Sequence, residues 1–223
     1  MYILADAAHL LKNLKACLLN NKFITIPFAI QEKYKLPTNI VHANHLHQLL
    51  LEQKDLNFLL TPRLCQSDID SKNQFKKMRV NTAKNVLSTN VSSALEFLAD
   101  ENNAPQYLTT AWFIKSIAKW FTLMTARHCS IALGKLHIEK FNESVTFLHE
   151  FINLFQNLTV GKKEQFKPVQ KGIIVTTTSI LELTNYLLEK RAFQFVFTGR
   201  MTQDCVENLF SVIRSKNPVP NAL

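Results

Sequence analysis

The stretch TTAWFIKSIAKWFTLMTAR (residues 109–127) decides the fold class, because its large apolar side chains recur at helical spacing without a glycine or proline. A face this broad predicts a helix that packs against other helices in a core. Stacking on a nucleic-acid base is the alternative role for such aromatic side chains. The apolar face is formed by Trp112, Phe113, Ile117, Trp120, Phe121 and Met124.

Apolar residues also recur at helical spacing on both sides of this stretch, in residues 39–53, 80–99 and 140–158. Short polar breaks separate these segments, so together they predict a compact helical unit. The chain has only four glycines in 223 residues, which argues against an all-β protein with frequent turns. The sequence therefore predicts a mainly α fold.

The two ends of the chain have a pattern typical of α/β structure. Tyr2–Ala5 form a short apolar run that predicts a buried strand, and Asp6 stands at the start of the helix that follows. Residues 172–178 (GIIVTTT) and 193–199 (FQFVFTG) are rich in β-branched or aromatic side chains and also predict strands. A helical block between two such ends indicates an insertion into a sheet domain.

Two further helices are predicted near the C-terminus. Ser179 and Glu182 have the spacing of a capping box, which predicts a helix start at Ser179. A final helix follows, with an apolar face that we expect to be buried. This face is formed by Val206, Leu209, Phe210 and Ile213. We expect three segments: a strand and helix in residues 1–19, a helical insertion domain in residues 20–165, and a return segment in residues 166–223.

Composition narrows the function classes. The net charge of +9 favours a polyanionic partner such as nucleic acid, although a basic surface in contact with water explains it equally well. No apolar run is long enough to span a membrane. The cysteines form no CxxC pair and the histidines of HANHLH (residues 42–47) lack ligand partners at zinc spacing, so no zinc site is predicted.

Two carboxylates in RMTQDCVENLFSVIR (residues 200–214) lie three residues apart at a helix start. Asp204 and Glu207 have the spacing of an N-cap residue and its third helical position, which would start the helix. The same spacing places both carboxylates on one helix face, where they could bind a metal ion. The local sequence permits both roles, and Asp6 before its own helix has the same ambiguity.

The stretch FTGRMTQDCVENLFSVIR (residues 197–214) resembles the LT-x-R-L-x-QD-x-x-EN-x-F motif of P-element-type DNA transposases, a family with THAP-finger relatives. DAAHLLKNLK (residues 6–15) is similar to that family's D-x-x-HL-x-K segment. Other matching segments fall between these two in the family's order. The resemblance implies an RNase H-like domain interrupted by a helical GTP-binding insertion, which acts on DNA in the nucleus.

The resemblance also implies a metal site. Asp6 would be the second catalytic aspartate and Glu207 the final catalytic glutamate, and both would hold Mg²⁺ for DNA cleavage and strand transfer. Asp204 would approach the metal that accompanies the nucleotide phosphates. The family's first catalytic aspartate lies on a strand before the first of these motifs, and this sequence does not contain it. We therefore expect a fragment or decayed derivative that is catalytically incomplete.

The nucleotide contacts implied by the resemblance are Arg63, Arg79, Val80 and Phe121. Where the family has F-D-x-x-N-x-R, this chain has Thr122 in place of the aspartate and Thr125 in place of the asparagine. A hydroxyl cannot pair with guanine N1–H and N2–H₂ as a carboxylate does, so we expect weakened selectivity for GTP. The expected partners are DNA, GTP and a second copy of the chain. The alternative function is a non-catalytic helical module that binds nucleotide or DNA.

Overall fold

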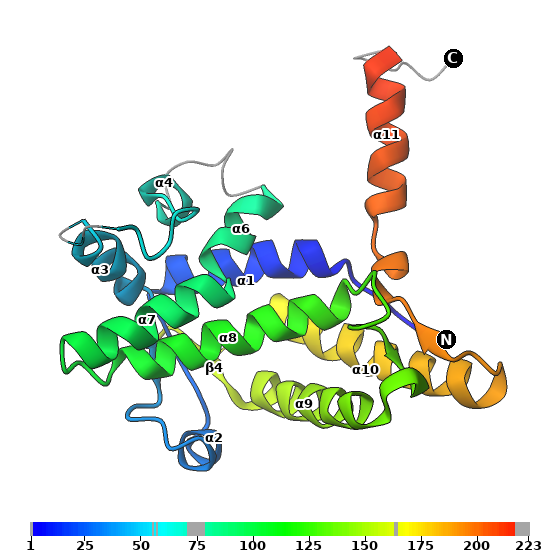
Figure 1. Ribbon diagram of the computed structural model, residues 1–223, viewed down its shortest axis with the longest axis horizontal. Helices are drawn as coiled ribbons and strands as arrows, with labels where there is room; N and C mark the ends of the chain where they lie inside the picture. Colours follow the sequence, from blue (N-terminus) through cyan, green and yellow to red (C-terminus); the bar gives the residue numbers. More distant parts are fainter. Residues whose placement is uncertain (1, 55, 57, 71–78, 163–164, 217–223) are drawn as a thin grey trace.

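The computed structural model describes residues 2–54, 56, 58–70, 79–162 and 165–216, and only the backbone of residues 204–206. The fold is mainly α, as predicted (Figure 1). The α-helices are α1 (Ala7–Asn21), α2 (Phe28–Lys33), α3 (Asn44–Glu52), α4 (Gln66–Ile69), α6 (Val80–Val86), α7 (Thr89–Glu101), α8 (Tyr107–Met124), α9 (Ile138–Asn157), α10 (Pro168–Lys190) and α11 (Asp204–Lys216). The described residues also include the short 3₁₀ helices η1 (Lys135–His137) and η2 (Thr198–Met201).

Helix α8 is the centre of the core, which confirms the helix predicted for residues 109–127. Its side chains of Phe113, Ile117 and Trp120 are fully buried. Trp112 and Phe121, which belong to the same predicted face, are only partly buried. The Trp120 ring stacks on Phe151 of α9 at a centroid distance of 5.6 Å. The aromatic face is therefore mostly core, and its edge at Phe121 reaches the surface.

The helix predicted over residues 80–99 is divided into α6 and α7. The break falls at Ser88, whose side chain accepts a hydrogen bond from the backbone N–H of Val91 at 3.3 Å. Serine at this position caps a new helix more favourably than it continues an old one. The break gives α7 an N-terminus of its own, separated from the end of α6 by two residues.

In the described part of the chain, five short strands form two small sheets. The first has the order β2-β1-β4 and the second pairs β3 with β5, all antiparallel. The first sheet ties the end of α1 to the end of α9, because Ile24 pairs with Val160. The strands are β1 (Phe23–Thr25), β2 (Ile40–His42), β3 (Leu133–Gly134), β4 (Thr159–Val160) and β5 (Phe195–Val196). Of the predicted strand at 193–199, only β5 has strand structure, and η2 follows it.

The strand predicted for residues 172–178 is wrong, since this stretch lies inside α10. The capping box predicted at Ser179 is wrong for the same reason. Tertiary contacts explain the difference: Trp120 Nε1 donates to Thr177 Oγ1 at 2.9 Å, and the Gln170 side chain donates to the carbonyls of Phe155 and Leu158 at 3.1 and 3.0 Å. These contacts outweigh the weak strand preference of β-branched residues.

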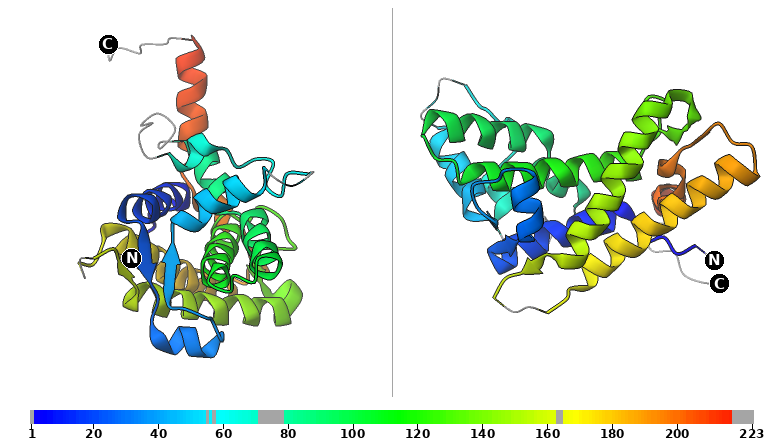
Figure 2. Two further views of the ribbon diagram at one scale, coloured as in Figure 1. Left: turned by 90° about the vertical axis from the view of Figure 1, so that its left-hand side faces the viewer. Right: turned by 90° about the horizontal axis from the view of Figure 1, so that it is seen from below.

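The strand predicted for Tyr2–Ala5 is also absent. These residues instead follow α10, with the N–H of Ile3 bonded to Ser179 Oγ at 3.2 Å and that of Ala5 to Thr176 Oγ1 at 2.9 Å. The side-chain hydroxyls of α10 thus satisfy backbone groups that a neighbouring strand would otherwise satisfy. The first segment of the chain therefore packs on the return segment, and α1 lies against α10 (Figure 2).

Helix α11 projects away from the other helices (Figures 1 and 2). Its apolar residues Leu209, Phe210 and Ile213 are 60%, 50% and 38% exposed. The prediction of a buried face on this helix is therefore wrong for these three residues, and the side chain of Val206 lies outside the description. Within the described residues, no helix combines the length and apolar character that crossing a bilayer requires.

Candidate functional site

Asp6 caps the N-terminus of α1. Its Oδ2 accepts hydrogen bonds from the backbone N–H of His9 at 3.0 Å and is 2.7 Å from His9 Nδ1. Its Oδ1 accepts from the backbone N–H of Gln203 at 3.3 Å, immediately before α11. Burial raises the pKa of this carboxyl, but the hydrogen bonds from His9 and Gln203 outweigh burial and hold the pKa below its usual value. Asp6 is thus a charged carboxylate that joins α1 to α11.

Glu207 lies one helical turn after this junction. Its backbone N–H donates to the carbonyl of Gln203 at 2.9 Å, and its side chain is exposed. The structure therefore brings Asp6 and the first turn of α11 together across most of the chain length. Asp204 is the first residue of α11, and its side chain lies outside the description.

The predicted metal ligands Asp6, Asp204 and Glu207 are carboxylates, the type of ligand that Mg²⁺ prefers. Asp6 is 4% exposed at its side chain, and both of its oxygens already accept hydrogen bonds. Among the side chains that the structure describes, no three His, Cys, Asp or Glu residues form a group that could hold a metal ion. The assignment of Asp6, Asp204 and Glu207 to a metal site stays a prediction.

The motif around Gly199 connects this junction to the end of α8. Thr198 Oγ1 donates to the carbonyl of Leu123 at 2.6 Å and accepts from the N–H of Ala126 at 3.0 Å. The Gly199 N–H donates to the Ala126 carbonyl at 3.0 Å. A Cβ on Gly199 would lie 2.9 Å from the carbonyl oxygen of Thr125, closer than real Cβ contacts. The glycine therefore lets η2 pack directly on the backbone after α8.

Two neighbouring cavities lie beside the end of α8. The larger, which we call the α8 cavity, has a volume of about 470 Å³. The smaller, the α7 cavity, has a volume of about 220 Å³ at the start of α7. Both are lined by Lys84, Ser88 and Thr89, so they adjoin. The α8 cavity also includes Phe121, Thr122, Thr125, Arg127 and His128, and the α7 cavity Thr61, Arg63, Asn85 and Asn90.

Two of the predicted nucleotide contacts line these cavities: Phe121 the larger and Arg63 the smaller. Arg79 and Val80 are not among the lining residues. Arg79 is the N-cap residue of α6, where its carbonyl accepts a hydrogen bond from Thr82 Oγ1 at 2.8 Å. The structure thus brings Arg63 and Phe121 to adjoining cavities and places Arg79 and Val80 about one turn before Lys84.

Lys84 was not predicted and is the cationic residue that lines both cavities. Its Nζ lies 5.2 Å from the ring centroid of Phe121, in cation–π geometry. The sequence did contain a signal for Lys84: it follows Val80, a predicted nucleotide contact, by four residues, and residues four apart share a helix face. Arg127, the last residue of the matched F-D-x-x-N-x-R segment, is a second cationic residue that lines the α8 cavity. The walls of both cavities contain cationic and hydroxyl side chains, which suit an anionic ligand.

The hydroxyls of Thr122 and Thr125 are already used. Thr122 Oγ1 donates to the carbonyl of Ala118 at 2.9 Å, and Thr125 Oγ1 donates to that of Phe121 at 2.7 Å. Each hydroxyl oxygen therefore offers only lone pairs to the cavity and carries no charge. Neither can form the paired, charge-assisted contacts of a carboxylate with a guanine edge.

The histidines of residues 42–47 have structural partners. His45 Nδ1 lies 2.8 Å from Thr110 Oγ1, and its ring meets Tyr107 edge-on at 4.8 Å. His47 Nδ1 lies 3.4 Å from Gln66 Nε2. Burial, with a smaller contribution from His42, lowers the pKa of His45 to about 4.

Comparisons with known proteins identify the family of the helical part and a solved structure with the same fold. Residues 8–135 match the family model described as a TNP-like, GTP-binding insertion domain. The chain is 26% identical to the transposable element P transposase of Drosophila melanogaster, and the alignment covers 97% of this chain and 28% of that protein. The fold matches a solved structure of the Drosophila P element transposase strand transfer complex with a TM-score of 0.80 and 22% identity, over 96% of this chain and 46% of that one. The chain thus spans less than a third of the length of the matched Drosophila protein.

Proposed function

Because this chain belongs to the family of TNP-like, GTP-binding insertion domains and is similar over nearly its whole length to a P element transposase, we propose that it is a nucleotide-binding part of a transposase-derived protein. The proposed ligand is a nucleoside triphosphate in the α7 and α8 cavities. The observation that carries the proposal is the meeting of Arg63 and Phe121 at adjoining cavities that share Lys84.

The phosphates would lie against cationic groups. Lys84 faces both cavities, and Arg63 lines the α7 cavity next to the first turn of α7. The unpaired N–H groups of a helix N-terminus add positive potential beside these side chains. A triphosphate placed there would contact both cationic side chains, and its base would extend into the α8 cavity beside Phe121.

Thr122 and Thr125 would discriminate between purine bases less strongly than a carboxylate does. Thr122 and Thr125 contribute neutral hydroxyl oxygens whose hydrogens are bonded to the backbone of α8. Purine bases of either kind could donate to such an oxygen. The proposed site therefore binds GTP and ATP with similar affinity.

The acidic junction between α1 and α11 is proposed as part of the metal site of the parent enzyme. The hydrogen bond between Asp6 and Gln203 supports this, because it holds a carboxylate beside the first turn of the helix that carries Asp204 and Glu207. Bound Mg²⁺ would neutralise charge during DNA cleavage and strand transfer. Asp6 and Glu207 would hold it, with Asp204 toward the nucleotide. DNA as substrate, a nuclear location and self-association belong to the same proposal.

Thermal-shift titration of the intact chain tests the nucleotide proposal. A ligand that binds only the folded state raises the melting temperature as its concentration passes Kd. We expect both GTP and ATP, with Mg²⁺, to raise the melting temperature, and inorganic triphosphate to raise it less. The absence of a shift with either nucleotide at millimolar concentration would refute the proposal.

A further inference from the structure

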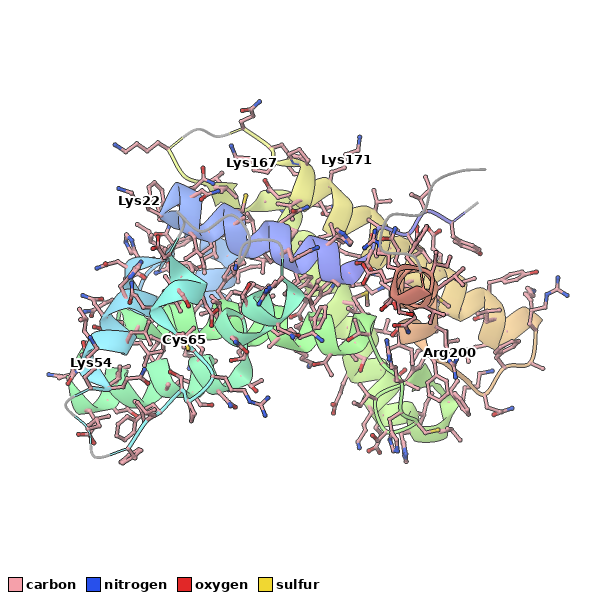
Figure 3. The ribbon with its side chains drawn as sticks, turned by 90° about the horizontal axis from the view of Figure 1, so that it is seen from above. Lys22, Lys54, Cys65, Lys167, Lys171 and Arg200 are labelled. Atoms are coloured by element: carbon pink, nitrogen blue, oxygen red, sulfur yellow. The ribbon has the colours of Figure 1, made fainter. Side chains whose placement is uncertain are left out.

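Four lysines gather where α1 ends and α10 begins. We call them the α1–α10 lysine cluster: Lys22, Lys162, Lys167 and Lys171. Lys22 is the C-cap residue of α1, and Lys162 follows β4. Lys167 precedes the first residue of α10, and Lys171 lies one turn beyond it. Figure 3 shows Lys22, Lys167 and Lys171 along the same edge of the molecule.

Specific contacts hold the cluster together. The N–H of Gly161 donates to the carbonyl of Phe23 at 3.0 Å, so Lys162 lies near Lys22. Gly161 also packs against Asn21, since a Cβ built on it would lie 3.1 Å from the Asn21 side chain. These contacts place Lys22, just before β1, and Lys162, just after β4, at the same end of the first sheet.

The start of α10 is fixed beside α1 in the same way. A Cβ built on Gly172 would lie 2.6 Å from Leu10 of α1, which shows how closely the two helices approach. The charge of Lys167 opposes the rise that burial causes in the pKa of the Cys17 thiol, so Lys167 also lies near α1. Lys171 lies one turn into α10, four residues after Lys167 at its N-cap.

The cluster lysines differ in their ion pairs from other lysines that the structure describes. Elsewhere Lys33 pairs with Glu150 and Lys115 with Glu96, whereas none of the four cluster lysines forms an ion pair with a described residue. Lys22 and Asp70 both line a further cavity, which has no lining residue in common with the α7 and α8 cavities. Lys22, Lys162 and Lys171 are exposed, and Lys167 is half-buried. The positive end of the α10 dipole adds to the potential at this edge.

We propose that the α1–α10 lysine cluster binds the phosphate backbone of duplex DNA. The proposal rests on the proposed function for the class of partner, while its location comes from the contacts above. Lysine acts as a point charge without the fixed fork of arginine, so the cluster would position DNA without reading its sequence. None of its members lines the α7 or α8 cavity, so DNA and nucleotide would bind at separate places.

Salt-dependent DNA binding tests this proposal. Fluorescence anisotropy would measure the Kd of a 20-base-pair duplex of arbitrary sequence for the intact chain and for Lys22→Gln/Lys167→Gln/Lys171→Gln. The control is Lys115→Gln/Lys140→Gln/Lys190→Gln, which removes the same charge from α8, α9 and the C-terminal end of α10, away from the cluster. Three lost phosphate contacts reduce the slope of log K against log salt by about 2.7, which makes the loss of affinity between 50 and 200 mM salt about 40-fold smaller.

We expect that reduction in the cluster variant and a slope in the control variant close to that of the unsubstituted chain. Equal slopes in the two variants, or no DNA binding by the unsubstituted chain at 50 mM salt, would overturn the proposal. Loss of binding to phosphatidylserine vesicles with unchanged DNA binding would overturn it too, because the surface would then serve a membrane. Circular dichroism checks that both variants fold. Nucleotide titration of the same proteins separates this proposal from the nucleotide site, which the cluster substitutions should leave unchanged.

Discussion

The carboxylate of Asp6 accepts a hydrogen bond from the backbone N–H of Gln203, 197 positions later in the chain. The same carboxylate caps α1 through His9. One side chain therefore fixes the start of the first helix and the start of the last. This contact places the two acidic motifs of the chain beside each other.

Asp6→Ala should destabilise the fold by about 1–2 kcal/mol, because it removes an N-cap and leaves the Gln203 N–H without its partner. Urea unfolding measures the loss. Asp6→Asn is the matched control, since its amide oxygen can still cap α1. Hydrogen exchange at Gln203 should accelerate in Asp6→Ala; unchanged exchange there would contradict the contact between Asp6 and α11.

Gly199→Ala should destabilise the fold by about 1–3 kcal/mol, the usual cost of overpacking a tight contact. The new methyl group would collide with the backbone carbonyls of Thr125 and Ala126, which cannot rotate away. Gly172→Ala is the control, because its Cβ would meet only the end of the Leu10 side chain and alanine favours the helix. Thermal unfolding that ranks Gly172→Ala as the more destabilised variant would refute this packing argument.

The free energy of unfolding should decrease as the solution becomes more acidic, because of His45. Its pKa is about 4 in the folded state and about 6.5 when unfolded, so the unfolded chain binds the additional proton in this range. The contribution of neutral His45 to the free energy of unfolding is complete above pH 6.5 and is lost as pH falls through 4. Between pH 7 and pH 5 this loss amounts to about 2 kcal/mol. Urea unfolding at both pH values measures it. His45→Gln should flatten this dependence, and an equally steep dependence in that variant would assign it to other groups.

Thr122→Asp should shift the nucleotide preference toward GTP. A carboxylate in the α8 cavity can accept from both guanine donors, and charge-assisted bonds of this kind contribute about 1.5–3 kcal/mol, or roughly 10- to 100-fold in affinity. Competition between GTP and ATP measures the ratio. Thr122→Asn is the control, because its neutral amide should change the ratio much less. A ratio that is the same in both variants would remove Thr122 from the base site.

The helical part of the fold could be predicted from the sequence, because the apolar period of α8 and α9 matches their buried faces. The errors occurred where packing decides between helix and strand. Ile173 and Thr177 favour strands by composition, yet Trp120 holds Thr177 in α10. The apolar face of α11 is visible in the sequence, but Leu209 remains exposed, since nothing in the sequence states what covers a face.

The candidate site could be predicted only in part. Arg63 and Phe121 came from a resemblance to a family, because no spacing rule relates residues so far apart. Lys84 was missed, although it lies one turn after Val80 on the same helix. The break at Ser88 matters as well, because Ser88 and Thr89 line both cavities together with Lys84.

The decisive test of the nucleotide site is isothermal titration calorimetry of GTP and ATP against the intact chain, Lys84→Gln and Lys115→Gln. Lys115 is a matched lysine on α8 that is paired with Glu96 and lines neither cavity. We expect Kd values for GTP and ATP within about tenfold of each other, about 10- to 100-fold weaker binding by Lys84→Gln, and no change in Lys115→Gln. Lys84→Gln binding as tightly as the unsubstituted chain, or no heat of binding for either nucleotide, would contradict the proposed nucleotide site.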